Sequence, residues 1–433
     1  MNILGIVSIG LLILLLLFGV PVGVAMATVG FLGLLCLSGI TSALGVLSTS
    51  TFSTLSSYDM SVVPLFVLMG YFAFYAGLSQ DLYRAGYIWL GRLRGGLAMG
   101  TVAGCAGFAA CCGSSVATAA TMGAVALPEM RRYGYDDRLA TGTLAAGGTI
   151  GILIPPSICL AVYGFITEQS IGKLFIAGIF PGLMEAASYI LTIHIICRLR
   201  PGFAPLMPKV RMTAKEKLRT TGGVWGVGAL AFLVMGGIYG GIFTPTEAGG
   251  VGAFGAFILM LLKRKFTRDN FSAALWETGQ VTAMAFFILI GATIFGYLLA
   301  VSKLPMDIAA WLSALSVNRY LILMGILFIF LVLGCIMDTL AIILLVVPIV
   351  YPAILELGFD AIWFGVMMVR LSELGLITPP VGLNVYVIYG VVKDVSLGTI
   401  FKGIVPFLLA DVVMVTLLIA FPQISLFLPS LMK

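Results

Sequence analysis

Oxygen-bearing side chains stand at two points of an otherwise apolar sequence. Ser114, Ser115 and Thr118 follow the run AACCG, and Asp338 and Thr339 follow GCIM. Hydroxyl, carboxylate and carbonyl oxygens are the ligands that hard cations prefer. A carboxylate near the centre of a bilayer costs on the order of 3 kcal/mol, so we predict a functional role for Asp338. For the two serines, ion contact and helix N-capping are both open, because one hydroxyl can do both.

Two other segments each interrupt an apolar run with a Pro-Pro pair. GGTIGILIPPS covers Gly147–Ser157, and ELGLITPPVGLN covers Glu373–Asn384. A helix broken near the membrane midplane offers N–H groups to an anion and carbonyl oxygens to a cation. In each segment we expect a glycine to unwind the first half-helix and the second proline to open the next one. These residues are Gly151 with Pro156, and Gly375 with Pro380.

Charged residues close to the second break allow two interpretations. Arg370 and Glu373 are three residues apart, so they can meet on one helix face. We favour a buried pair that neutralises itself; in the alternative, Arg370 attracts an anionic substrate while Glu373 orients it or helps to hold a cation. Asn384 could cap a helix or line the same site. Glu185 and Asp411 are assigned to helix packing, together with the helices on which they lie.

The composition is that of a protein that crosses a membrane many times. Of 433 residues, 61% are hydrophobic and 10% are charged, against about 25% charged in a soluble domain. No GxxxxGK[ST] loop for ATP occurs, and a single histidine without a metal-ligand cluster argues against an enzyme. We therefore expect an all-α polytopic membrane protein with no transition metal and no organic cofactor. The apolar segments are 3–19, 22–40, 62–79, 97–128, 139–167, 173–197, 223–240, 247–262, 271–300, 319–353, 361–391 and 399–421.

Clusters of basic residues predict which loops face the cytoplasm. They are Arg84–Arg94, Arg131–Arg138, Arg198–Arg219 and Lys263–Arg268. The segment 97–128 has a basic cluster on either side, so it is predicted to be a re-entrant helical hairpin that enters and leaves from the cytoplasm. The segment 319–353 has few basic residues around it and is predicted to be a second hairpin that enters from the opposite side.

The hairpins and breaks repeat at a constant spacing. Pro379 minus Pro155 is 224, and so is Pro380 minus Pro156. Without gaps, this offset gives eight identities in the 46 positions from Cys111 to Pro156, mainly at the hairpin tip, the hairpin exit and the helix break. Each unit is read as helix, hairpin, broken helix and helix. Because the two units open on opposite sides, the sequence predicts an inverted-topology repeat, the architecture of many secondary transporters.

This repeat divides the chain into a scaffold, two units and a tail. The expected segments are 1–61 for N-terminal scaffold helices, 62–197 for the first repeat with its broken helix at 139–167, 198–270 for a cytoplasmic basic loop and connecting scaffold helices, 271–421 for the second repeat with its broken helix at 361–391, and 422–433 for a C-terminal tail.

Four motifs together resemble one family of transporters. GGTIGILIPPS, TPTEAG, GCIMDT and ELGLITPPVGLN occur in this order along the chain. Over essentially its whole length the chain resembles the large membrane subunit of tripartite ATP-independent periplasmic (TRAP) transporters, the DctM-like family. The resemblance implies an elevator-type fold like that of the ion transporter superfamily, in the bacterial inner membrane. It also implies that a Na⁺ gradient drives the import of an organic acid, with Na⁺ as the coupling ion.

The resemblance also implies partners and site residues. The partners are a periplasmic substrate-binding protein and a small four-helix membrane subunit, expected as a separate chain because the sequence begins directly with the large-subunit pattern. The residues expected to bind sodium are Ser114, Ser115, Gly147, Gly151, Pro155, Gly334, Asp338, Thr339, Gly375, Thr378 and Pro379. Those expected to face the organic acid are Ser115, Thr118, Pro156, Ser157, Arg370, Pro380 and Asn384.

Two other kinds of transport protein are the alternatives to this interpretation. A self-sufficient divalent-anion/sodium symporter would take up substrate without a binding protein or a small subunit. A channel would need a continuous pore, whereas one long chain with two opposed hairpins favours alternating access.

Overall fold

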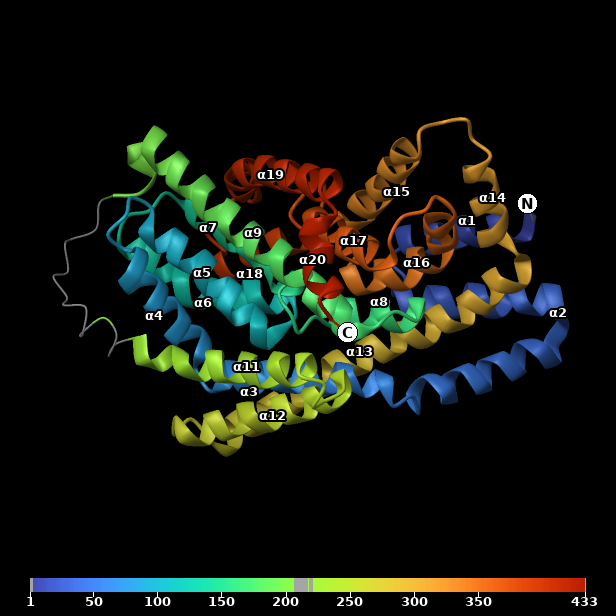
Figure 1. Cartoon of the computed structure of the whole chain (residues 1–433), viewed down its shortest axis with the longest axis horizontal. Helices are drawn as coiled ribbons and strands as arrows, with labels where there is room; N and C mark the ends of the chain where they lie inside the picture. The colour runs from blue at the N-terminus through green and yellow to red at the C-terminus, as the bar shows by residue number, and fades with distance from the viewer. Residues whose placement is uncertain (1–2, 206–216, 218–220, 433) are drawn as a thin grey trace.

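The computed structural model describes residues 3–205, 217 and 221–432, and every regular element there is a helix (Figure 1). One group of helices packs in sequence, with α1 and α3 on the α2–α13 pair, α12 on α3 and α11 on α12. Its members are α1 (Ile3–Leu17), α2 (Val22–Leu55), α3 (Val62–Tyr75), α11 (Trp225–Tyr239), α12 (Pro245–Leu262) and α13 (Arg268–Ser302). We call this group the scaffold. The short helices α4 (Leu78–Leu90) and α14 (Leu304–Ser313) connect it to the rest, and the C-terminal helix α20 (Gln423–Ser430) packs mainly against α9 (Ile171–Leu199).

Two series of five helices make up the remainder of the molecule. The first consists of α5 (Gly96–Cys112), α6 (Ser115–Arg132), α7 (Asp137–Leu153), α8 (Ile158–Thr167) and α9 (Ile171–Leu199). The second consists of α15 (Arg319–Gly334), α16 (Thr339–Glu356), α17 (Ala361–Gly375), α18 (Leu383–Val392) and α19 (Leu397–Ala420). The helices therefore follow one another in the same order and with similar lengths in both series.

The α5–α6 and α15–α16 pairs open at opposite ends of the broken helix α7–α8. At the start of α7, Arg131 near the end of α6 forms an ion pair of 2.9 Å with Asp394. Hydrogen bonds from this guanidinium lower the pKa of the Asp394 carboxyl. At the far end of α8, the Tyr351 hydroxyl on α16 donates to the carbonyl of Thr167 at 3.4 Å. The two pairs thus point their tips toward each other from opposite ends.

Small residues let the scaffold helices approach each other closely. A Cβ atom built on Gly30 of α2 would lie 2.8 Å from the backbone nitrogen of Phe295 on α13. Helix α2 does not continue straight: Gly39 has non-helical dihedral angles, φ 79° and ψ 171°. The apolar segment 22–40 predicts only the first half of this element; the second half runs on to Leu55.

Two segments that the sequence does not predict as helices are helical. Residues 84–94 were interpreted as a basic loop, but α4 extends to Leu90. This helix is amphipathic: Leu78, Leu82 and Tyr83 are buried, while its Asp81 pairs with Lys263 after α12. The α14 helix likewise has no counterpart among the apolar segments. Of the predicted loop 198–219, residues 206–216 and 218–219 lie outside the described residues.

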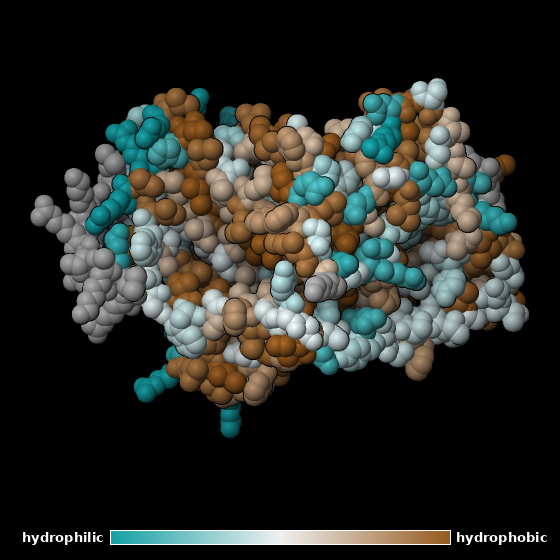
Figure 2. Space-filling model, in the orientation of Figure 1, coloured by the Kyte–Doolittle hydropathy of each residue, from teal (hydrophilic) through white to brown (hydrophobic). Residues whose placement is uncertain are grey.

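The surface of the protein exposes many large apolar side chains, as a lipid environment requires. Among the described residues, seven helices are long and apolar enough to cross a membrane, or up to nine if each bent helix pair is one span. Apolar side chains cover much of the left and centre of the face in Figure 2, and hydrophilic ones gather at the upper left, at the upper right and right of the centre. The prediction of an all-helical, polytopic membrane protein agrees with this arrangement.

Gly30→Val should destabilise the contact between α2 and α13. The added side chain would meet backbone atoms of α13, which cannot move aside as a flexible side chain can, and overpacking of this kind costs about 1–3 kcal/mol. Thermal unfolding of the purified protein in detergent measures the effect. Gly45→Val on the same helix is the matched control, because a Cβ there would have no atom within 4 Å. Equal melting temperatures for both variants would contradict the close contact.

Candidate functional site

The tips of the two helix pairs meet at a single buried carboxylate. Ser115 is the first residue of α6, and Thr339, which matches it at the offset of 224, is the first residue of α16. Both hydroxyls donate to Oε1 of Glu373 on α17, from 3.4 Å for Ser115 and 2.8 Å for Thr339. All three residues are buried. Glu373 therefore links the two series of helices at the centre of the molecule.

Glu373 still has an oxygen to offer. Its Oε2 is buried and has no hydrogen-bond partner among the described residues. The nearby Asn384, at the start of α18, is fully buried, and both atoms of its amide lack partners too. A Cβ built on Gly148 would lie 3.2 Å from Nδ2 of Asn384 and 3.0 Å from the carbonyl oxygen of Ser115. Unpartnered oxygen and amide groups thus lie beside the first tip.

The first tip packs closely against the first break. A Cβ on Gly113, which has φ 61°, would lie 2.6 Å from the carbonyl oxygen of Pro156. A Cβ on Gly151 would lie 3.0 Å from the carbonyl oxygen of Ser114. The Thr118 hydroxyl donates to that same carbonyl at 2.7 Å. Backbone oxygens and hydroxyls are therefore concentrated where the tip touches the break.

The second tip packs against the second break in the same way. A Cβ on Gly375 would come within 2.6 Å of the carbonyl oxygen of Leu331, and Gly334 lies directly beside it. The backbone N–H of Gly382 donates to the Cys335 carbonyl at 3.1 Å, which fastens the start of α18 to the tip. The Thr378 hydroxyl donates to the Leu374 carbonyl at 2.6 Å within the break itself.

Three of the predicted site residues serve as helix N-caps. Ser114 accepts a hydrogen bond from the Ala117 N–H at the start of α6, and Ser157 accepts one from the Leu160 N–H at the start of α8. Asp338 accepts from the Leu340 N–H at 3.0 Å at the start of α16. Capping satisfies one of the free N–H groups of each helix. One Asp338 oxygen is used for this bond, and the residue is half-buried.

The prolines and glycines of the breaks do not have the roles that the sequence suggests. Pro156 and Pro380 precede the N-caps of α8 and α18, so neither lies in the first turn of a half-helix. Each forms a cis bond with the proline before it, Pro155 and Pro379. Gly151 and Gly375 remain helical; their lack of a side chain makes room for the tips. Gly147 makes room for Cys105 on α5 rather than for a tip.

Arg370 does not pair with Glu373. Its guanidinium lies 3.0 Å from Glu185 on α9 and also forms an ion pair with Asp411 on α19. Tyr189 donates to Asp411 at 2.9 Å, and all four side chains are buried. The interpretation of Arg370 and Glu373 as a self-neutralising pair is therefore wrong: on one helix, position 370 turns toward α9 and α19, and position 373 turns toward the tips. The Arg370 guanidinium is already paired with two carboxylates of the protein. Its contact with an anionic substrate therefore stays a prediction.

Sequence reasoning missed the linking role of Glu373: it considered a cation at this carboxylate only as the alternative to an ion pair and left it out of the residues expected to bind sodium. The available signal was the matching of Ser115 with Thr339, because equivalent tip residues of two opposed hairpins converge. Glu185 and Asp411, which end each series at nearly equivalent places, could likewise have been recognised as carboxylates that share one arginine. Spacing along the sequence favoured Glu373, three residues away, as the partner of Arg370 over the distant Glu185 and Asp411.

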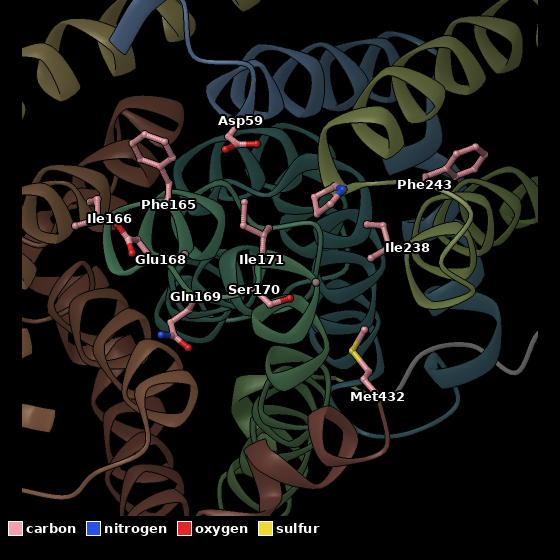
Figure 3. A pocket seen from close by; sticks show the side chains of 13 residues that line it. Asp59, Phe165, Ile166, Glu168, Gln169, Ser170, Ile171, Ile238, Phe243 and Met432 are labelled. Atoms are coloured by element: carbon pink, nitrogen blue, oxygen red, sulfur yellow. The ribbon is translucent and has the colours of Figure 1, made fainter. Parts of the chain in front are cut away.

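A large open cavity lies away from the tips. It has a volume of about 760 Å³ and lies between the turn from α8 to α9, the turn from α11 to α12 and the C-terminus (Figure 3). Asp59 and Glu168 contribute carboxylates, while no lysine or arginine lines it among the described residues. Two carboxylates without a basic side chain would repel an anion, so we do not place an anionic ligand there.

Arg370→Gln should strongly destabilise the folded protein. Removing the guanidinium leaves two buried carboxylates without their cation, a loss of about 3–5 kcal/mol. Adding Asp411→Asn removes one of these charges, so the double variant should lose much less than the sum of the single effects. Thermal unfolding of the three variants measures this. Additive losses would contradict an energetic link between the two side chains.

Comparisons with known proteins identify the family. The family described as "Tripartite ATP-independent periplasmic transporter, DctM component" matches residues 9–424. The C4-dicarboxylate TRAP transporter large permease protein of Pseudomonas aeruginosa is 38% identical over 89% of this chain and 89% of its own. The sialic acid TRAP transporter large permease protein of Vibrio cholerae is 32% identical over 96% of each chain.

A solved structure has the same fold. The YdaH transporter of Alcanivorax borkumensis aligns with a TM-score of 0.66 over 90% of this chain and 91% of its own, at 16% sequence identity. At this identity the likeness concerns the fold alone. The matched residues and the sequence relatives show that the chain belongs to the DctM family, the large permease component of TRAP transporters.

Proposed function

We propose that this permease imports an organic acid across the bacterial inner membrane, driven by a Na⁺ gradient. The observation that carries the proposal is the convergence of Ser115 and Thr339 on Glu373. Opposed hairpin tips that share one buried acidic group form a central site that is reached from either end by opening one tip. Such a site is what alternating access needs.

Na⁺ is proposed to bind at the two contacts between a tip and a break. The first contact offers the Ser114 carbonyl, the Ser115 hydroxyl and the backbone around Gly151. The second offers Thr339, the Asp338 carboxylate and the backbone around Gly334 and Gly375. We add Glu373 to the predicted ligands, because its Oε2 is buried without a partner and carries the charge that a cation would neutralise.

The substrate is proposed to be an organic acid that binds beside the tips. The two relatives described above are named for C4-dicarboxylate and for sialic acid, both of which are carboxylates. A Na⁺ ion at each tip would offset the charge of Glu373 and make room for an anion. Asn384 is suited to hold a carboxylate, because its amide is buried and unpartnered.

Movement is proposed to follow an elevator mechanism. The pairs α5–α6 and α15–α16 are taken as re-entrant hairpins of an inverted repeat, which carry the site together with the broken helices. The scaffold would stay fixed, because α2, α3, α12 and α13 pack extensively on each other through contacts such as that of Gly30. As in other tripartite systems, a periplasmic binding protein would deliver the substrate, and a small membrane subunit would support the scaffold.

Na⁺ should stabilise the protein specifically, and the tip residues should be needed for this. At about 100 times its Kd, a ligand of the folded state adds roughly 2.7 kcal/mol. We expect a higher melting temperature in NaCl than in KCl at equal ionic strength, and a smaller difference in Ser115→Ala, Thr339→Ala and Glu373→Gln. Thr101→Ala is the matched control, since this buried hydroxyl donates only within α5. Equal melting temperatures in both salts would remove the assignment of these ligands.

Asn384→Leu should weaken substrate transport without abolishing the effect of Na⁺ on stability. A lost hydrogen bond to a charged group is worth about 1.5–3 kcal/mol, so KM should rise about ten- to a hundredfold. The measurement is uptake of radiolabelled C4-dicarboxylates and sialic acid into proteoliposomes that contain the permease, its small subunit and its binding protein. Leucine has a similar size, which limits changes in packing.

The same assay separates the two transport interpretations. A Na⁺ gradient directed inward should drive accumulation only when the binding protein is present. Uptake by the permease alone would instead support a self-sufficient symporter, and flux that does not saturate would indicate a channel.

A further inference from the structure

An apolar groove runs along one side of the second series of helices. It lies between α15, α17 and α19, which gather near one another in Figure 1, and has a volume of about 480 Å³. Tyr320, Met324 and Leu331 of α15 form one wall, and Leu374 of α17 lies at the base. Val412 and Thr416 are on the opposite wall, where the Thr416 hydroxyl donates to the Val412 carbonyl of its own helix. The groove therefore offers water little to bind.

Apolar hollows of this kind stay dry and accept apolar guests. In the membrane the available guest is a lipid acyl chain, because groove residues such as Val412 are exposed on the surface of the protein. The dimensions agree. Tyr320 and Leu331 are eleven residues apart on one helix, which corresponds to about 16 Å. One leaflet of a hydrocarbon core of about 30 Å has nearly this depth.

Arg319 does not line the groove itself, but it lies next to the groove residue Tyr320 and donates to the Leu357 carbonyl at 3.5 Å. The Arg319 guanidinium lies 5.2 Å from the centre of the Tyr320 ring and 5.3 Å from that of Phe359. Its side chain is exposed and makes no ion pair among the described residues. A tyrosine and an arginine at this depth are typical of the membrane interface. Phosphate is the anion that an arginine there would meet.

We propose that this groove binds a phospholipid of the surrounding bilayer, with one acyl chain between α15 and α19 and the phosphate on Arg319. The inner end of the chain would lie against Leu331 and Leu374. These residues flank the close approach of α15 to α17, where a Cβ on Gly375 would lie 2.6 Å from the Leu331 carbonyl oxygen. A lipid there holds the second helix pair against α17, directly behind Glu373.

Photochemical labelling tests the acyl-chain part of the proposal. The permease is placed in nanodiscs that contain phosphatidylglycerol with a diazirine near the end of one acyl chain, illuminated and mapped by mass spectrometry. We expect adducts concentrated on the groove residues of α15 and α19. Thr416→Trp fills the groove and should reduce them to the level of other lipid-facing positions. Val413→Trp is the matched control, because Val413 is exposed on the same helix outside the groove.

Arg319→Gln tests whether Arg319 binds the lipid phosphate. Arg319 is exposed, so we expect this variant to fold. Labelling by the phosphatidylglycerol probe should fall about fivefold, the effect of one basic residue near anionic headgroups. A diacylglycerol probe with the same chain should not respond to this change. Uniform labelling of all lipid-facing helices, unaffected by Thr416→Trp, would mean ordinary solvation by lipid and overturn the proposal. Loss of groove labelling when the small subunit is added would assign the groove to a protein contact and would overturn it as well.

Discussion

A single buried carboxylate determines how the two halves of this permease meet. Glu373 accepts hydrogen bonds from Ser115 and Thr339, one from each tip, and no other part of the described structure joins both tips through one group. A charge at this depth is costly unless it is compensated. The short approaches at Gly113 and Gly375 bring the tips close enough for these bonds to form. The glycines at the tips and breaks therefore allow the hydrogen bonds that compensate the buried Glu373 carboxylate.

The two series of helices share a backbone plan but differ in charge. At the offset of 224 residues, Arg370 corresponds to Ala146 and Glu373 corresponds to Thr149. Thr149 does not face the tips' shared carboxylate; its hydroxyl lies 2.7 Å from Glu185, in the cluster around Arg370. Both buried charges of α17 thus act between the series, one toward the tips and one toward α9 and α19. The backbone plan is repeated, but only α17 carries buried charges at these positions. This one helix therefore contacts both series through charged side chains.

Sequence periodicity predicts the order of elements here better than it predicts partners. The 224-residue offset depends on backbone requirements, such as small residues at breaks and tips, and these are visible as identities. Charge partners such as Arg370 with Glu185 and Asp411 come from three helices far apart in sequence, so spacing along the chain does not reveal them. Amphipathic α4 was missed for a related reason: its Arg84 begins a basic cluster that resembles a loop, and only packing reveals the buried face of the helix.

The geometry at Glu373 limits how either tip can open. If the first tip withdraws, Glu373 loses the Ser115 hydroxyl; if the second withdraws, it loses the shorter bond from Thr339. Withdrawal of both would leave a buried carboxylate with no donor, which is the most costly arrangement. The cation proposed at its free oxygen would compensate the charge in either case. Opening of a tip and binding of that cation would then be linked through the same group, as the coupling of an ion gradient to the movement of another solute requires.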